Sequence, residues 1–437
     1  MSTHWPRTTN WAARYRMPTC RHGYVTVNSE ELNEVRVVLE LGCELIPLGH
    51  IVRDGNVISL ELRPDRLLPG GLLGPDVLMH PGRIHPAAGF PIFGFAADSS
   101  PDRWGRELMR RRASAEKHAK PRQLGPWDFL LQVQDAGRHG AIRYFDPASG
   151  EAIDNHPSPI PGMVNLRELE HASLGLEHAI EQDDLEQIDA WLRVLVAPGS
   201  SLGGARPKAN VVDPDGQLHI AKFPSRNDTI DSGLWEHIYA ELGHRAGTNP
   251  LRSRVARFAG HHHTFLAPRF DRRGDQRLHY LSAMTLTGKQ DGESASYLNI
   301  LEALDDHGDP MHIAADRRLL YRRMLFNVLM GNRDDHLRNH GFLITERGAR
   351  LTPCFDVNPS LDKLDHATSL DCDSSEPDLD AALACADMFG LNTQQANSVL
   401  NELRDSLANW KAVAKSLGGR SAEIRLVEAV IHDAVSG

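Results

Sequence analysis

A chain of 437 residues is too long for one compact core, so we expect two or three folding units. Hydrophobic residues make up 41% and charged residues 24% of the chain, which is ordinary for a globular protein. The sequence contains neither an apolar secretory signal nor an apolar run near the ~18 residues of a membrane span, and this argues against a membrane protein. The net charge of −10 disfavours direct binding to nucleic acid, and five cysteines without a CxxC pair favour reduced thiols in a cytoplasm over a disulfide framework.

The N-terminal part is expected to be a β-rich accessory subdomain, residues 23–150, after a loosely ordered extension of residues 1–22. Its β-branched and alternating runs, punctuated by glycines, predict a small antiparallel sheet. In chain order we expect strands at 35–41 and 57–62, a helix from 99 through 112, a strand near 141–145, and a Pro/Gly/Asp-rich linker over 146–162. The helix start is indicated by residues 99–102, which supply a serine cap and a first-turn proline.

The next unit, residues 151–285, is expected to be a nucleotide-binding lobe. The turn Asp213-Pro214-Asp215-Gly216 joins two short apolar runs and predicts a β-hairpin. The expected segments are a helical stretch over about 165–197, hairpin strands at 209–212 and 218–223, a helix at 232–246, and strands near 253–259, 264–270 and 277–284.

Residues 286–437 are expected to form an α-helical lobe. Helical periodicity begins near 312, gives way to a loop and two short strands between 331 and 357, and returns from 378 to 436. A β-rich lobe followed by an α-rich lobe predicts an α+β, two-lobed protein-kinase-like fold with an N-terminal accessory subdomain.

The first chemical motif is a run of small residues directly before the hairpin. Ser201, Gly203, Gly204 and Ala205 let backbone amides approach phosphate oxygens, and Lys208 adds positive charge. The run is not a Walker A loop, and a plain flexible turn is the alternative interpretation.

The second motif is a lysine on the second hairpin strand. Ile220, Ala221 and Phe223 flank Lys222, so its stem packs while its ammonium reaches into a site. In protein kinases such a lysine grips the α- and β-phosphates and is held by a helix glutamate, and Glu236 is the natural partner. An ordinary surface lysine is the alternative.

The third motif is a dense polar cluster after an apolar helix end. Asp334 and Asn339 have the D-x-x-x-x-N spacing of a kinase catalytic loop, in which the aspartate accepts the proton of the attacking hydroxyl and the asparagine oxygen binds Mg²⁺. Asp356 follows a short strand and is placed to bind the same cation. A turn residue is the alternative for Asp356, but all these pieces occur in the order that a kinase needs.

These motifs resemble the HipA family of bacterial serine/threonine kinase toxins. The resemblance rests on residues 201–208, 219–224, 269–272 and 331–339, and on 98–105 in the accessory subdomain. It implies that Lys222 and the Gly-rich loop bind ATP, that Asp334 is the base, and that the chain autophosphorylates at Ser201, with Ser200 as a competing acceptor. Many relatives have Lys where this chain has Arg338, which keeps the charge but changes the geometry.

The resemblance also implies partners. The expected substrate is a cytosolic protein of translation, such as an aminoacyl-tRNA synthetase, and the expected partner is a helix-turn-helix antitoxin through which DNA is contacted only indirectly. ATP is expected between the lobes, with its adenine near Met284. Two other functions remain open, a small-molecule kinase with the same phosphoryl-transfer site and a non-catalytic regulatory scaffold.

Overall fold

The computed structural model describes most of the chain, and the following account is confined to those residues. They are 24–42, 44–62, 73–77, 82–115, 123–155, 160–182, 184–195, 206–258, 260–371 and 375–435.

A seven-stranded sheet organises the N-terminal part, in the order β1-β7-β6-β2-β3-β4-β5. Only β1 and β7 pair in parallel; the other pairs are antiparallel. The strands are β1 (Tyr24–Val25), β2 (Glu34–Leu41), β3 (Glu44–Asp54), β4 (Val57–Leu62), β5 (Gly82–Ile84), β6 (Ile142–Phe145) and β7 (Ala152–Ile153). The strands expected at 35–41, 57–62 and 141–145 are therefore present.

Two expectations for this part are corrected. The expected linker, residues 146–162, contributes β7 to the sheet, because Ala152 pairs with Phe145 across a tight hairpin. The helix expected from residue 99 is α2 (Arg103–Ala115), and Asp102 caps it by accepting a hydrogen bond from Gly105 N at 2.6 Å. Ser100 instead donates to Ala96 O in the preceding helix α1 (Gly94–Asp98). Helix α3 (Pro126–Leu131) completes this part.

A second sheet of four antiparallel strands has the order β10-β11-β9-β8. Its strands are β8 (Lys208–Val212), β9 (Leu218–Lys222), β10 (Arg254–Ala256) and β11 (Thr264–Pro268). The expected hairpin is β8–β9, and the expected helix is α6 (Ser232–Arg245), which Asp231 caps by accepting from Leu234 N. The expected helical stretch is two helices, α4 (Leu166–Glu181) and α5 (Leu185–Leu195), packed against each other.

Strands and a short helix connect this sheet to the C-terminal part. Strands β12 (Arg272–Arg273) and β13 (Gln276–Arg277) form a small hairpin, and β14 (Tyr280–Ser282) joins β15 (Gly341–Thr345) and β16 (Gly348–Leu351) in a third sheet. The strand expected to reach residue 284 stops at Ser282, because its side chain caps α7 (Ala283–Leu286) by accepting from Thr285 N at 3.1 Å.

The C-terminal part is helical, as expected. Its helices are α8 (Tyr297–His307), α9 (Ile313–Met330), α10 (Leu379–Ala384), α11 (Thr393–Leu407), α12 (Trp410–Ser416) and α13 (Ser421–Glu428). From Leu320 onwards most side chains of α9 are buried, so this helix is the centre of the lobe. Tyr239 of α6 donates to Met330 O at 2.6 Å and fixes the end of α9, from which the catalytic-loop motif continues.

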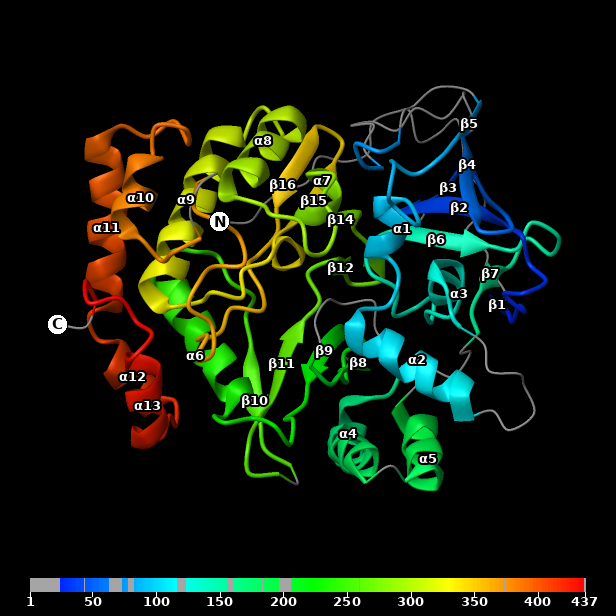
Figure 1. Ribbon diagram of the computed structural model, residues 1–437, viewed down its shortest axis with the longest axis horizontal. Coiled ribbons are helices and arrows are strands. Elements are labelled where there is room, and N and C mark those ends of the chain that lie inside the picture. Colours follow the sequence, from blue (N-terminus) through cyan, green and yellow to red (C-terminus); the bar gives the residue numbers. More distant parts are fainter. Residues whose placement is uncertain are drawn as a thin grey trace.

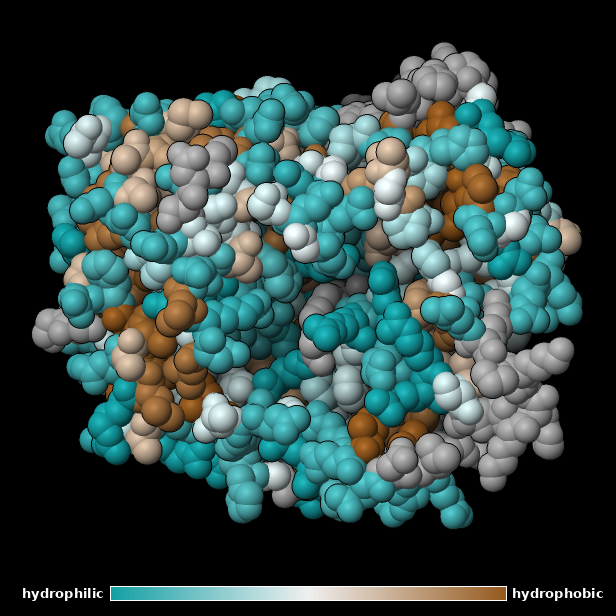
Figure 2. Space-filling model, in the orientation of Figure 1, coloured by the Kyte–Doolittle hydropathy of each residue, from teal (hydrophilic) through white to brown (hydrophobic). Residues whose placement is uncertain are grey.

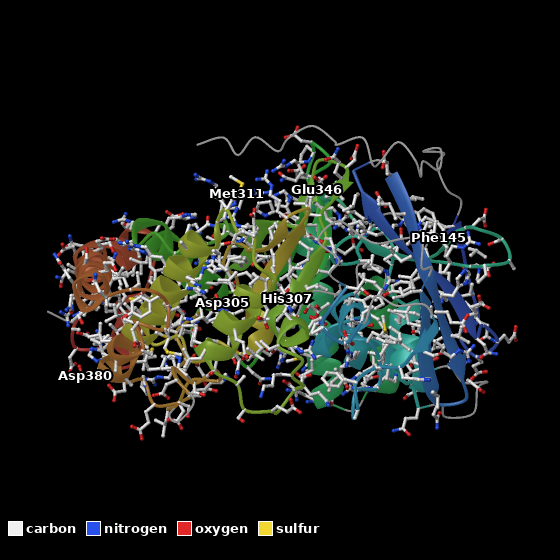
Figure 3. The ribbon with its side chains drawn as sticks, turned by 90° about the horizontal axis from the view of Figure 1, so that it is seen from above. Phe145, Asp305, His307, Met311, Glu346 and Asp380 are labelled. Carbon is white, nitrogen blue, oxygen red and sulfur yellow. The ribbon has the colours of Figure 1, made fainter. Side chains whose placement is uncertain are left out.

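The views show how these parts are arranged. In Figure 1 the seven-stranded sheet lies at one end, helices α10–α13 lie at the other, and the third sheet and α9 lie between them. Seen from above in Figure 3, Phe145 of β6 and Asp380 of α10 are near opposite ends of the molecule. Within the described ranges no helix is long and apolar enough to cross a bilayer.

Candidate active site

A cleft of about 1020 Å³ lies where helices α1 and α2 of the accessory part, the hairpin sheet and the C-terminal part meet. Figure 2 shows a hollow near the middle of this face. Its walls include α2, the β8–β9 hairpin, α6 and the loops around residues 334 and 356. The volume is at the upper end of the range of small-molecule and cofactor sites, and is large enough for a nucleotide. Lys222, Glu236, Asp334 and Asp356 all line it.

Lys222 is held between two carboxylates. Its Nζ lies 2.7 Å from Glu236 Oε1 and 2.5 Å from Asp356 Oδ1, and its side chain is buried. Lys222 is buried because β9 is a central strand: it pairs with both β8 and β11, and every residue of β9 is buried. The pairing with Glu236 is the contact that the sequence predicted, and the contact with Asp356 adds a second partner from a distant loop.

The electrostatics of this cluster follow from one cation shared by two acids. Burial alone would lower the pKa of Lys222, but Asp356 and Glu236 outweigh it and raise that pKa above its ordinary value. Burial raises the pKa of Glu236, whereas the pKa of Asp356 is lowered because Lys222 and Lys208 outweigh its burial. Asp356 is therefore the carboxylate that stays ionised most readily, as a cation ligand must.

The backbone at Asp356 is unusual. Its φ is +57°, a left-handed conformation that few non-glycine residues adopt. The ring of the preceding Phe355 stacks on Phe270 at 5.3 Å, and Leu251 N donates to Cys354 O at 3.0 Å, so contacts of the two preceding residues fix the segment. Such strain persists where the surroundings over-determine the conformation, and here it directs a carboxylate into the cleft.

The loop after α9 carries Asp334. Gly331 ends the helix with φ +66°, and a Cβ there would lie 2.3 Å from Val430 O, so this position requires glycine. Asn339 Nδ2 then donates to Asp334 O at 2.8 Å, which closes the loop locally and leaves the Asp334 carboxylate about half exposed, at 51%. An exposed carboxylate at the rim of a cleft is accessible to an incoming hydroxyl.

The side chain that contacts Asp334 is one that the sequence did not single out. Lys363 forms an ion pair with Asp334 Oδ1. Its backbone is fixed to the same loop, because Arg333 Nη1 donates to Lys363 O at 2.6 Å and Ala367 N donates to Arg333 O at 2.9 Å. Arg338, four residues after Asp334, instead makes a bidentate pair with Asp291 at 2.9 and 2.7 Å. No local signal marks Lys363, since its partner lies in a different segment.

Asp335 has a different environment from its neighbour Asp334. Its carboxylate is 1% exposed and accepts from Tyr297 Oη at 2.7 Å, His366 Nδ1 at 2.9 Å and the backbone of Ala367 at 3.1 Å. Burial alone would raise the pKa of Asp335, but hydrogen bonding and charge from His366, with Tyr297, lower it overall. Asp335 thus fastens the loop that presents Asp334.

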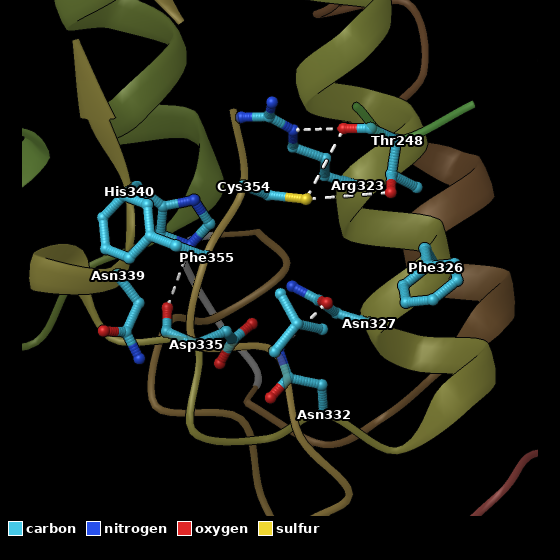
Figure 4. Close-up of a pocket in the computed structure, with 11 residues that line it drawn as sticks. Thr248, Arg323, Phe326, Asn327, Asn332, Asp335, Asn339, His340, Cys354 and Phe355 are labelled. Carbon is cyan, nitrogen blue, oxygen red and sulfur yellow. Dashed lines mark hydrogen bonds between the residues drawn. The ribbon is translucent and has the colours of Figure 1, made fainter. Parts of the chain in front are cut away.

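A cavity of about 20 Å³ lies directly behind this loop, enough for one water molecule. In Figure 4, Asn339, Asp335 and His340 gather on one side of it, and Cys354, Arg323 and Thr248 are joined by hydrogen bonds on the other. The cavity thus borders both the catalytic loop and the segment that precedes Asp356.

Asp335→Ala is expected to destabilise the fold by about 3 kcal/mol, because buried donors lose their acceptor. Since the folded-state pKa of Asp335 is lowered, its stabilisation is present above the ordinary aspartate pKa and is lost as the pH falls through the lower folded value. Urea unfolding at neutral and acidic pH measures both effects. The half-exposed Asp334→Ala is the matched control, with an expected change under ~1 kcal/mol. Equal losses in the two variants would contradict this assignment.

The other residues expected to contact the nucleotide have separate outcomes. Lys208, expected to add positive charge to the Gly-rich loop, forms an ion pair with Asp102 of the accessory part at 2.9 Å, and both side chains are 1% exposed. Met284 lies in α7 and is not among the described residues that line the cleft. Ser200, Ser201, Gly203, Gly204 and Ala205 lie outside the described residues.

Comparison with known proteins gives one family match and similar solved structures. Residues 200–410 match the model of the family described as HipA-like C-terminal domain. A chain of the Shewanella oneidensis MR-1 toxin–antitoxin complex of HipA, HipB and operator DNA has a similar structure: 17% identity, TM-score 0.62, covering 92% of this chain and 96% of that one. At that identity the likeness establishes the fold, so the expected α+β architecture is confirmed.

Another solved structure is more distant. The Helicobacter pylori proinflammatory kinase CtkA is 14% identical with a TM-score of 0.37, over 54% of this chain and 92% of that one. No curated protein matches the chain in sequence.

Proposed function

Because the chain belongs to the HipA family through its C-terminal domain, residues 200–410, we propose that it is an ATP- and Mg²⁺-dependent serine/threonine protein kinase and the toxin of a toxin–antitoxin pair. One observation carries the proposal: a single cleft is lined by a buried lysine paired with two carboxylates and by an accessible aspartate on a fastened loop. Those are the parts that phosphoryl transfer requires.

The residues then have distinct roles. Lys222 binds the ATP phosphates and Glu236 holds its ammonium in place. The acceptor hydroxyl oxygen attacks the γ-phosphorus, the bond from that phosphorus to the bridging oxygen breaks, and ADP leaves. Asp334 takes the hydroxyl proton, and the nearby Lys363 offsets negative charge as the phosphoryl group approaches.

The oxygen donors present fit Mg²⁺. Asp356 offers a carboxylate in the cleft, and Asn339, which lines the small cavity behind the catalytic loop and donates its Nδ2 to Asp334 O, offers an amide oxygen. Among the residues described, no group of three or more His, Cys, Asp and Glu side chains could hold a metal. Mg²⁺ would therefore be held by few protein oxygens together with the nucleotide phosphates, and it would neutralise their charge.

The family also suggests substrate, partner and regulation. A cytoplasmic protein of translation, such as an aminoacyl-tRNA synthetase, is the proposed acceptor. The similar solved complex contains HipA, HipB and operator DNA, which supports a helix-turn-helix antitoxin partner that mediates any DNA contact. Self-inactivation by phosphorylation at Ser201, or at Ser200, is proposed because a phosphate of about −1.5 to −2 charge is incompatible with ATP phosphates in one loop.

The test is phosphoryl transfer from labelled Mg-ATP. Wild-type protein is incubated with nucleotide, with and without cell lysate, and label is followed into protein and metabolite fractions. Intact mass is measured for wild type, Ser200→Ala, Ser201→Ala and the double variant. We expect label to appear in a lysate protein. We also expect the wild-type kinase itself to gain one phosphate, and Ser201→Ala to lack it. Label confined to metabolites would indicate a small-molecule kinase, and no transfer at all would indicate a scaffold.

A further inference from the structure

Most of the Lys and Arg side chains that line the cleft are paired with carboxylates, but three have no such partner in the described part of the chain. Most have a carboxylate partner: Lys222 with Glu236 and Asp356, Lys208 with Asp102, Arg206 with Asp228, Arg269 with Asp271, Arg338 with Asp291, and Lys363 with Asp334. Arg103, Arg106 and Arg110 also line the cleft, but none of the three forms an ion pair with a carboxylate in the described ranges. All three belong to α2.

The three arginines form one ordered surface. Their spacing of three and four residues places them on the same face of α2, over about 10 Å of helix. Arg106 Nε donates to Pro101 O at 2.9 Å, and the guanidinium groups of Arg106 and Arg110 lie 5.5 and 5.2 Å from the centre of the Phe129 ring. Arg103 and Arg110 are exposed. Figure 2 shows hydrophilic side chains beside the hollow where α2 lies.

The local charge balance favours an anion at this surface. Burial and the charge of Arg338 lower the pKa of Arg106, and Arg110 lowers it as well, although Asp291 and Asp102 act in the opposite direction; the net lowering means that the cations repel one another at close range. The nearby Asp102 and Asp291 are already paired with Lys208 and Arg338. In a chain of net charge −10, three neighbouring cations that have no carboxylate partner among the described residues are a specific feature, and a bound anion would relieve their repulsion.

We propose that Arg103, Arg106 and Arg110 form a docking surface for an acidic segment of the acceptor protein, with carboxylates close to the serine or threonine that is phosphorylated. The inference rests on the proposed kinase function. Arg338 connects the surface to the catalytic loop, because it follows Asp334 by four residues and lies near Arg106. About 10 Å is the span of three residues of an extended peptide.

A peptide fits this surface better than a nucleic acid does. RNA is a long polyanion, and a protein with ten excess negative charges repels it over its length. A short acidic segment contacts only the α2 arginines and does not extend over the rest of the negatively charged protein. The nucleotide phosphates have a different candidate cation, Lys222 of the β8–β9 hairpin.

The experiment compares binding of labelled peptides with a central serine flanked by Asp/Glu, by Gln/Asn or by Lys/Arg, and of a single-stranded RNA. Anisotropy titrations use wild type and Arg103→Glu/Arg110→Glu, which alters exposed residues only. Arg106→Gln is a second variant. The matched control is Arg111→Glu, on the same helix but paired with Glu107 and outside the cleft lining.

Wild type should bind the acidic peptide most tightly. The double variant should weaken that binding by roughly 10-fold or more, and Arg111→Glu should change it by about 2-fold or less. The inference is overturned if the neutral peptide binds as tightly, if the double variant binds as wild type does, or if only RNA binding depends on α2. Mg-ATP affinity is measured in parallel and should be equal in all variants. Its absence in wild type would refute the kinase proposal, while the peptide titrations would still decide the role of α2.

Discussion

Asp334→Asn is expected to reduce phosphoryl transfer by about 10²–10⁴-fold while the protein stays folded. Asparagine has nearly the shape of aspartate but cannot accept the proton of the acceptor hydroxyl. Stability should change little, because the Asp334 side chain is about half exposed and its ion pair with Lys363 is at the surface. Transfer rates with saturating Mg-ATP, alongside urea unfolding, measure the two properties.

Two further variants make this result specific. Asp335→Ala changes the adjacent residue, which is buried, so it should lower stability first and activity only as a consequence. Lys363→Ala removes the cation beside Asp334 but not the base, so it should reduce transfer less than Asp334→Asn does. If Asp334→Asn transfers phosphate within a few-fold of wild type, the base is another residue.

Lys222→Met is expected to reduce transfer by about 10²–10³-fold, because it removes the positive charge proposed to hold the ATP phosphates. The substitution also leaves two carboxylates, Glu236 and Asp356, without their shared cation. Removing one partner of a buried ion pair costs about 3–5 kcal/mol, so a loss of stability is expected as well. ATP titration and unfolding are therefore measured together.

Lys222→Arg separates charge from geometry. It keeps a cation between Glu236 and Asp356, so stability should be largely retained, but a planar guanidinium cannot reproduce the compact ammonium, and transfer should stay impaired. Wild-type transfer by Lys222→Met, or full activity of a folded Lys222→Arg, would mean that Lys222 has only a structural role.

Some features were predictable because their causes are local. The hairpin follows from the turn Asp213-Pro214-Asp215-Gly216, and α6 begins where Asp231 can cap it. The Asp334–Asn339 spacing has a local reason too, since the Asn339 amide closes the loop onto Asp334 O. The roles assigned to these residues remain predictions that the variants above test.

The sequence by itself determined the order of the motifs, the helices and hairpins set by caps, turns and hydrophobic periodicity, and the match of residues 200–410 to the HipA-like C-terminal domain. The Lys222–Glu236 ion pair was predictable from the motif order, but the tertiary structure decided the other ion pairs of the cleft. Lys208 pairs with Asp102, Arg338 with Asp291 and Lys363 with Asp334, and each partner comes from another segment of the chain. An ion pair depends on distance in space, and local sequence patterns carry no information on how distant segments pack. For that reason only the tertiary structure shows that the α2 arginines lack a carboxylate partner among the described residues, whereas the other Lys and Arg side chains of the cleft have one.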